Sequence, residues 1–135
     1  MNNNSWGVSF ASISWFDDYL KSHKNVKGFI REKDIVFRVE SKIQNDMLTI
    51  ILLNEYTMSV TKILKVIKEF GGVDIIVVGG NWNSYTSGAK EHAIQQELGL
   101  FNSAEIGAAL FKNDYWNFHR KDRNGSPQYH IREEQ

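Results

Sequence analysis

The sequence feature that most constrains the fold is the aliphatic run of residues 73–78, which ends at Gly79 and Gly80. Unbroken Val and Ile runs without alternating polar residues are typical of strands that are covered on both faces. Residues 59–70 have the apolar spacing of an amphipathic helix, and residues 89–98 are expected to form a second helix. The run therefore predicts an α/β fold in which helices cover a sheet.

Composition indicates one globular domain. The 135 residues suffice for one hydrophobic core, so we expect a single α/β domain over residues 1–135, with residues 1–5 disordered. The 16 basic and 16 acidic side chains give a formal net charge of +0, which argues against binding that depends mainly on phosphate contacts. The absence of cysteine excludes disulfides and thiolate metal sites. Because no apolar run reaches membrane length and no signal-peptide pattern opens the sequence, we expect a cytoplasmic protein that does not contact membranes.

The first part of the chain predicts a helix with an aromatic stripe. Ser12 or Ser14 is expected to cap this helix, in which Trp15 and Phe16 begin a set of aromatic residues at helical spacing. The stripe either packs the helix on the sheet or forms a surface on which bases stack, and we favour packing. Alternation over residues 6–10 predicts a short extended segment that docks two aromatic side chains.

The next segments predict strands. Residues 26–30 and 35–39 surround a charged turn and favour a hairpin, whereas residues 47–53 are apolar throughout and favour a central strand. Ser59 is expected to cap the helix that follows. A crossover through this helix makes the strands at 47–53 and 73–78 parallel neighbours. The predicted order is helix, three strands, helix, strand, helix, in a mixed central sheet.

The second half of the chain resembles the restriction-endonuclease-like superfamily, the PD-(D/E)XK nucleases, and within it the Mrr-type branch. The resemblance is strongest over residues 74–110. Residues 87–93 look like that branch's loop and helix opening, and residues 98–101 followed by 102–106 look like its short terminal strand, capped turn and last helix. The resemblance implies a restriction-endonuclease-like core and, in the catalytic members, Mg²⁺-dependent cleavage of nucleic acid.

The catalytic pattern of that superfamily is not intact in this chain. The family places an acid at the end of one strand and Glu/Gln-X-Lys on the next, because carboxylates hold Mg²⁺ while the lysine positions water or stabilises charge. Residues 52–54 of the expected central strand are Leu-Leu-Asn, with neither acid nor lysine. We therefore expect the site to be lost on that strand.

A displaced metal site is the alternative. Glu40 and Lys42 match Glu-X-Lys, and Asp17 or Asp18 of the first helix could supply a further ligand. Asp34 cannot share a metal with Glu40, because six steps along one strand separate them by roughly 20 Å. A divergent nuclease would therefore use Glu40, Lys42 and Asp18.

Other chemical motifs are weaker. Ser87 and Lys90 satisfy Ser-X-X-Lys at a helix start, but we favour Thr86 or Ser87 as the helix cap and Lys90 as a solvated residue of the first turn. The loop at 79–88 could bind an anion through backbone N–H groups, although it lacks a P-loop pattern. The four histidines show no zinc-binding spacing, so we predict no metal site outside the nuclease alternative.

Residues 113–135 predict a C-terminal hairpin extension, because Asn124, Gly125 and Pro127 form a turn signal between two runs that contain aromatic residues. Basic residues between the aromatics suit a nucleic-acid or anionic-partner surface, or else they only protect a sheet edge. Together with the loop after residue 80, this hairpin forms the expected partner surface. Its candidate binding residues are Trp82, Asn83, Tyr85, Arg120, Lys121 and Arg123. The alternative is that Trp82 and Tyr85 fold inward and fasten the loop to the last helix.

Two functions follow. We favour a small non-catalytic interaction protein on a degenerate nuclease-like scaffold, such as an immunity protein, an inhibitor or an accessory subunit, with no cofactor. Its partner is expected to be a protein, and nucleic-acid binding is the second choice. The alternative is a divergent Mg²⁺-dependent endonuclease.

Overall fold

A five-stranded mixed sheet forms the centre of the computed structural model, which describes residues 5–43, 47–80 and 83–133. The strand order is β1-β2-β3-β5-β7, with antiparallel pairing from β1 to β3 and parallel pairing from β3 to β7. The predicted single-domain α/β fold with a mixed central sheet is confirmed. The strands are β1 (Val26–Glu32), β2 (Val36–Ser41), β3 (Met47–Leu53), β5 (Ile75–Val78) and β7 (Gly99–Asn102).

The centre of the sheet lies where the aliphatic runs predict it. Strands β3 and β5 are parallel neighbours, with Ile51 beside Ile76, and helix α2 (Val60–Phe70) connects them. All four residues of β5 are fully buried. Strand β5 therefore has apolar neighbours on both faces, as its unbroken Ile and Val sequence requires.

Helix α1 (Phe10–Ser22) covers one face of the sheet, and its start differs from the prediction. Ser9, not Ser12 or Ser14, is the N-cap, and its side chain accepts a hydrogen bond from the Ser12 amide at 3.2 Å. Phe10 is consequently the first helical residue and is 76% exposed, so its predicted docking is wrong, whereas Trp6 packs against the core as predicted. The Phe16 ring packs edge-on against Phe37 of β2 at 4.9 Å, which confirms packing of the helix on the sheet.

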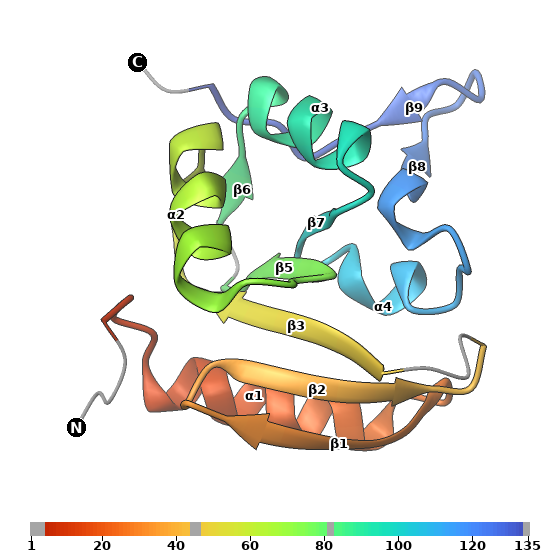
Figure 1. The fold of residues 1–135 in the computed structure, drawn as a ribbon. Coiled ribbons are helices and arrows are strands. Elements are labelled where there is room, and N and C mark those ends of the chain that lie inside the picture. The colour runs from red at the N-terminus through yellow and green to blue at the C-terminus, as the bar shows by residue number, and fades with distance from the viewer. Residues whose placement is uncertain (1–4, 44–46, 81–82, 134–135) are drawn as a thin grey trace.

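The other face is covered by α2 and by α3 (Ser87–Gln95). In Figure 1, α1 lies behind β1 and β2, whereas α2 lies in front of the sheet with α3 beside it. Ser59 caps α2 as predicted, and Gly71 ends it with a φ of 78°. The front of β1 and β2 stays open, which leaves Ile30 exposed.

Short elements complete the chain. A two-stranded parallel sheet joins β4 (Thr57–Met58) to β6 (Ser84–Tyr85), and α4 (Ile106–Ala109) follows β7. The C-terminal hairpin is present but shorter than predicted, because its first arm begins as a 3₁₀ turn, η1 (Tyr115–Asn117). Its strands are β8 (Arg120–Lys121) and β9 (Pro127–Gln128). None of the helices in the described residues has the length and apolar character needed to cross a membrane.

Candidate functional site

A cleft of about 420 Å³ opens where the parallel strands end, on the α1 side of the sheet. Trp15 and Tyr19 of α1 form one wall, with ring centroids 5.6 Å apart, and Gly80, Ser103 and Ala104 form the other. Gly80 follows β5, and Ser103 and Ala104 follow β7. The carboxyl ends of strands in open α/β sheets are common ligand sites. We call this hollow the carboxyl-edge cleft.

Amide and hydroxyl groups hold the loops at this end of the sheet. Asn83 Nδ2 donates to Asn54 Oδ1 at 2.9 Å and to the Gly79 carbonyl. Ser103 Oγ donates to the Gly80 carbonyl at 3.0 Å. Gly80 has a φ of 98°, which is costly for any residue with a Cβ. These contacts fix the loop positions without using a carboxylate.

The basic hairpin reaches the rim of the cleft. Arg120 Nη2 donates to the Ala104 carbonyl at 2.6 Å, so β8 lies against the loop that forms one wall. Lys121 and Arg123 are exposed on the same hairpin. The structure therefore brings part of the predicted surface together: the hairpin and the loop after β5 both adjoin the cleft.

Behind the wall formed by Ser103 and Ala104 lies a buried polar cluster centred on Glu105. The Tyr85 hydroxyl lies 3.0 Å and 2.8 Å from the two Glu105 carboxylate oxygens and donates its hydrogen bond to this group. The Asn102 amide donates to Glu105 Oε1 at 3.1 Å, and Asn102 Oδ1 accepts from the Ala104 and Glu105 amides. Since Ser103 and Ala104 lie inside this bonded turn, Glu105 acts as a positioning residue for the cleft wall.

Lys90 of α3 is the other buried charge of the cluster. It is 2% exposed, and its Nζ donates to the Leu100 carbonyl at 2.7 Å. The same ammonium lies over the rings of Phe101, Tyr85 and Tyr129, 4.4, 5.3 and 5.5 Å from their centroids. Burial lowers the pKa of Lys90 to about 8, and the charge of Glu105 opposes part of that shift.

Lys90 and Glu105 form hydrogen bonds with backbone groups on the free edge of the sheet, which is the outer side of β7. The Gly99 amide donates towards β5, to the Asp74 carbonyl at 2.9 Å, so backbone groups of Leu100 and Asn102 point away from β5. Within the part of the chain that the structure describes, no further strand of the main sheet lies beyond β7. Lys90 and Glu105 therefore bond the Leu100 carbonyl and the Asn102 amide, groups that would otherwise stay unpaired in the interior.

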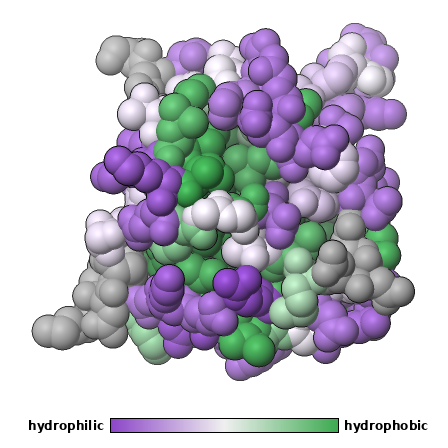
Figure 2. Space-filling model, in the orientation of Figure 1, coloured by the Kyte–Doolittle hydropathy of each residue, from purple (hydrophilic) through white to green (hydrophobic). Residues whose placement is uncertain are grey.

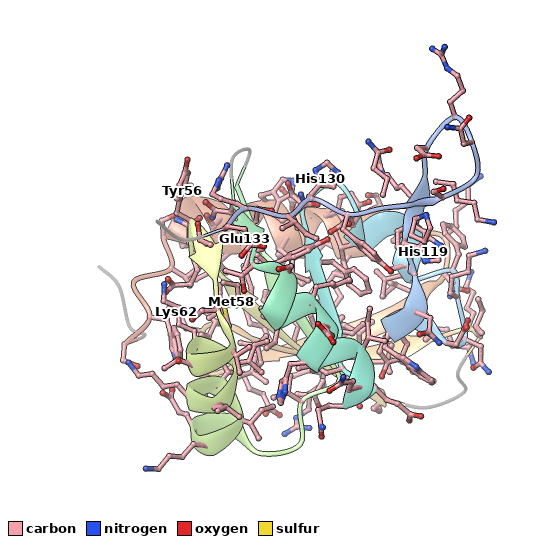
Figure 3. The ribbon with its side chains drawn as sticks, turned by 90° about the horizontal axis from the view of Figure 1, so that it is seen from above. Tyr56, Met58, Lys62, His119, His130 and Glu133 are labelled. Carbon is pink, nitrogen blue, oxygen red and sulfur yellow. The ribbon has the colours of Figure 1, made fainter. Side chains whose placement is uncertain are left out.

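The C-terminal segment covers this cluster. In Figure 3 it runs from the hairpin near His119 past His130 and Glu133 towards Tyr56. The His130 amide donates to the Tyr85 hydroxyl at 3.3 Å, and Glu133 accepts from the Ser87 amide at 3.0 Å at the start of α3. The Ser87 contact lowers the pKa of Glu133. This segment thus closes the cluster from solvent.

The residues of the nuclease alternative do not come together. Phe37 faces α1, so Glu40, which alternates with it along β2, faces the opposite side of the sheet. Asp18 lies two residues after the sheet-facing Phe16 and points away from the sheet on the α1 side. Glu40, Lys42 and Asp18 are all exposed. Among the described residues, no group of three His, Cys, Asp or Glu side chains could hold a metal ion, so Mg²⁺ does not fit these donors.

The expected binding residues differ in how far the structure buries them. Tyr85 is fully buried, so its proposed role as a surface anchor is wrong. Trp82 lies outside the described residues, and its role stays a prediction. Asn83 is half-buried and holds the loop through its amide, while Arg120, Lys121 and Arg123 are exposed as expected.

Sequence reasoning missed the buried state of Lys90 and the cleft wall. Lys90 was expected to be solvated, but α3 turns it towards the edge of β7. Thr86 caps α3 as predicted. Trp15 and Tyr19 were expected to pack the helix on the sheet, with base stacking as the alternative, and their rings also line the carboxyl-edge cleft. The sequence signal that could have indicated this wall is the pair Trp15 and Tyr19, two aromatic residues one helical turn apart.

No family model, curated protein or solved structure matches this chain.

Lys90 should give the stability of the protein a distinctive pH dependence. Its pKa of about 8 in the fold lies below the ordinary 10.5, so the unfolded chain binds more protons between these values and stability should rise with pH. We expect the free energy of unfolding to increase by ~1 kcal/mol per pH unit between pH 8 and pH 10. Above that range the raised pKa values of Tyr85 and Tyr129 should lower it again. Urea unfolding across this range measures the effect.

The matched variant is Lys90→Met, which keeps an unbranched chain among the three rings and removes the titrating group. Its unfolding free energy should be nearly flat over the same pH range. An identical slope in wild type and variant would show that another group causes the rise.

Proposed function

We propose that this protein is a non-catalytic interaction protein on a restriction-endonuclease-like scaffold, and that it binds a protein partner at the carboxyl-edge cleft. The observation that carries the proposal is the chemistry of the strand ends. Asn54, Asn83 and Ser103 supply amides and a hydroxyl there, bonded to one another's loops. Neutral groups of this kind hold loops and recognise polar atoms, but they do not concentrate the negative charge that Mg²⁺ requires.

The shape of the cleft supports binding. Trp15 and Tyr19 offer two ring faces beside Gly80, which has no side chain, so a partner side chain could reach the loop backbone. Aromatic residues in a hollow with a polar rim are typical of the energetic centre of protein interfaces. The buried bonds of Glu105 keep one wall fixed before binding, which lowers the entropy lost in the complex.

The charges around the cleft favour a protein over a polyanion. Arg120 and Lys121 lie on the hairpin side, whereas Asp18 is exposed on α1 one turn after Trp15. A nucleic-acid backbone would be attracted to one rim and repelled by the other. Protein surfaces carry both signs and can match such a rim, which orients the partner during association.

Filling the cleft should abolish partner binding without unfolding the protein. Ala11 is an exposed α1 residue that lines the cleft, and arginine keeps a good helix former there. We expect Ala11→Arg to weaken binding of the cognate partner by ~2 kcal/mol or more, mostly through faster dissociation. Surface plasmon resonance with the partner recovered on immobilised wild-type protein measures this change.

The matched control is Ala108→Arg, at an exposed helical alanine of α4 outside the cleft lining. It should bind like wild type. Equal affinities for Ala11→Arg and wild type would place the partner surface elsewhere on the molecule.

A further inference from the structure

The C-terminal segment adds a further strand-like pairing to the small parallel sheet of β4 and β6. Ile131 pairs with Tyr85 of β6 in the parallel direction, and the Arg132 amide donates to the Tyr85 carbonyl at 2.7 Å. Strand β4 pairs with the opposite edge of β6. We call residues 129–133 the C-terminal strap. It occupies an edge of β6 whose backbone groups are able to pair with any added strand.

Two charged side chains anchor the end of the C-terminal strap. The Arg132 guanidinium lies 3.8 Å from the centroid of the Tyr56 ring, and its Nη1 donates to the Tyr56 carbonyl at 2.9 Å. The Glu133 carboxylate accepts a hydrogen bond from the Ser87 amide at 3.0 Å. Ser87 is the first residue of α3, and the positive end of the helix dipole favours an acidic group there.

The C-terminal strap covers buried residues but is itself little buried. Tyr129 supplies one of the three rings beside the Lys90 ammonium, and Lys90 and Tyr85 are almost completely buried. Three of the five strap residues are exposed, and so are all residues of the hairpin from 120 to 128. Figure 2 shows mostly hydrophilic residues over this hairpin, at the upper right. Because polar edge contacts hold the strap, its departure costs little apolar burial.

We propose that this edge of β6 is a binding site for an extended segment of a partner protein, and that the C-terminal strap blocks the site until the partner segment displaces it. The strap shows the chemistry that the site selects: an aromatic residue, any residue, then an aliphatic, a basic and an acidic residue. Strand addition is a common mode of peptide recognition, in which backbone hydrogen bonds give affinity and side-chain contacts give specificity. A bound partner segment keeps the buried cluster covered.

The charges of the site select the order of the two charged residues. The basic side chain meets a carbonyl and the face of an aromatic ring at Tyr56, whereas the acidic one meets an amide at Ser87. In the reversed order, a carboxylate would face the carbonyl and a cation would face the start of α3, and both contacts are unfavourable. Neither residue lines the carboxyl-edge cleft, so this site does not depend on the proposed function.

A fluorescent peptide with the sequence of residues 126–133 tests the proposal by anisotropy titration. Wild type should bind it weakly, because the tethered strap competes at a high effective concentration. Arg132→Pro in the full chain removes the amide that bonds Tyr85 and the guanidinium that bonds Tyr56, but leaves the site itself unchanged. We expect this variant to bind the peptide ~10-fold or more tightly than wild type does.

Two controls test how the peptide is recognised. A peptide in which Arg132→Glu and Glu133→Arg exchange the two charges should bind the Arg132→Pro chain ~10-fold or more weakly. Ser87→Pro, added to that chain, removes the amide that meets the acidic residue, and proline is well tolerated at the first helical position. It should weaken binding of the original peptide but leave the affinity of a Glu133→Ala peptide unchanged.

Wild type provides a readout that requires no variant to fold. With excess peptide, the amide resonances of Arg132 and Glu133 in the isotope-labelled protein should move to random-coil positions. A peptide that binds neither wild type nor Arg132→Pro at millimolar concentration, or that binds both equally, would overturn the proposal. Dimerisation of wild type over the same concentrations in sedimentation would also overturn it, because two copies would then exchange their straps.

Discussion

Replacing Ile76 by Asp should unfold the protein. Ile76 is fully buried in β5, between Ile51 of β3 and Leu100 of β7, and no basic side chain of these strands can pair with a carboxylate there. An unpaired buried carboxylate costs several kcal/mol, against a total stability of ~5–15 kcal/mol for a typical domain. Circular dichroism and the dispersion of amide resonances would show the loss of structure.

Ile30→Asp provides the control for this change. The same substitution is made in the same sheet, but Ile30 is 61% exposed on β1. It should keep the fold and melt within a few degrees of wild type. If Ile76→Asp also kept the wild-type melting temperature, β5 could not be the buried centre of the sheet.

Glu105→Ala should cause the second-largest loss of stability. The change removes the acceptor for the Tyr85 hydroxyl and the Asn102 amide, and it takes the compensating negative charge from buried Lys90. Each buried donor that loses its acceptor typically costs ~1–3 kcal/mol, so the two donors together predict a loss of ~2–6 kcal/mol. Urea unfolding at pH 7 measures this loss.

Two variants separate the roles of Glu105. Glu105→Gln keeps a side-chain oxygen for both donors and should lose less stability than the alanine variant. Tyr85→Phe removes only the hydroxyl and should cost ~1.5–3 kcal/mol, the usual value for a hydrogen bond to a charged group. Equal losses for Glu105→Ala and Glu105→Gln would mean that the charge, not the hydrogen bonds, holds the turn at Asn102.

The central sheet could be predicted because its physical signal is local. An unbroken aliphatic run such as that of β5 can be buried only when both faces are covered, and the amphipathic α2 between two such runs supplies the parallel crossover. The N-caps Ser59 and Thr86 could also be predicted from the sequence. A side-chain oxygen just before a helical pattern accepts a hydrogen bond from an amide in the first turn of that helix.

The polar interior could not be predicted in the same way. Lys90 has the sequence context of a solvated helix residue, and only the position of α3 beside the free edge of β7 gives its ammonium a backbone carbonyl to bond. Tyr85 likewise belongs to a polar loop, yet Glu105, twenty residues later, draws its hydroxyl inside. Such contacts depend on the edge of a folded sheet, which no short window of sequence contains.

The alternative metal site at Glu40 shows the same limit of prediction from sequence. Glu40 and Lys42 match a motif by spacing, but a motif on one strand says nothing of which face it shares with another element. The packing of Phe16 on Phe37 decides this, because it turns Glu40 to the side of the sheet opposite α1 and Asp18.

The proposal that this protein does not catalyse metal-dependent cleavage can be tested directly with Mg²⁺ and Mn²⁺. Calorimetric titration of the full chain with each ion is combined with a cleavage assay on duplex and single-stranded DNA and RNA. For a non-catalytic interaction protein we expect no binding heat at micromolar ion concentrations and no cleavage of any substrate. Metal-dependent cleavage by wild type that is abolished in Glu40→Ala would contradict this and identify the protein as a divergent nuclease.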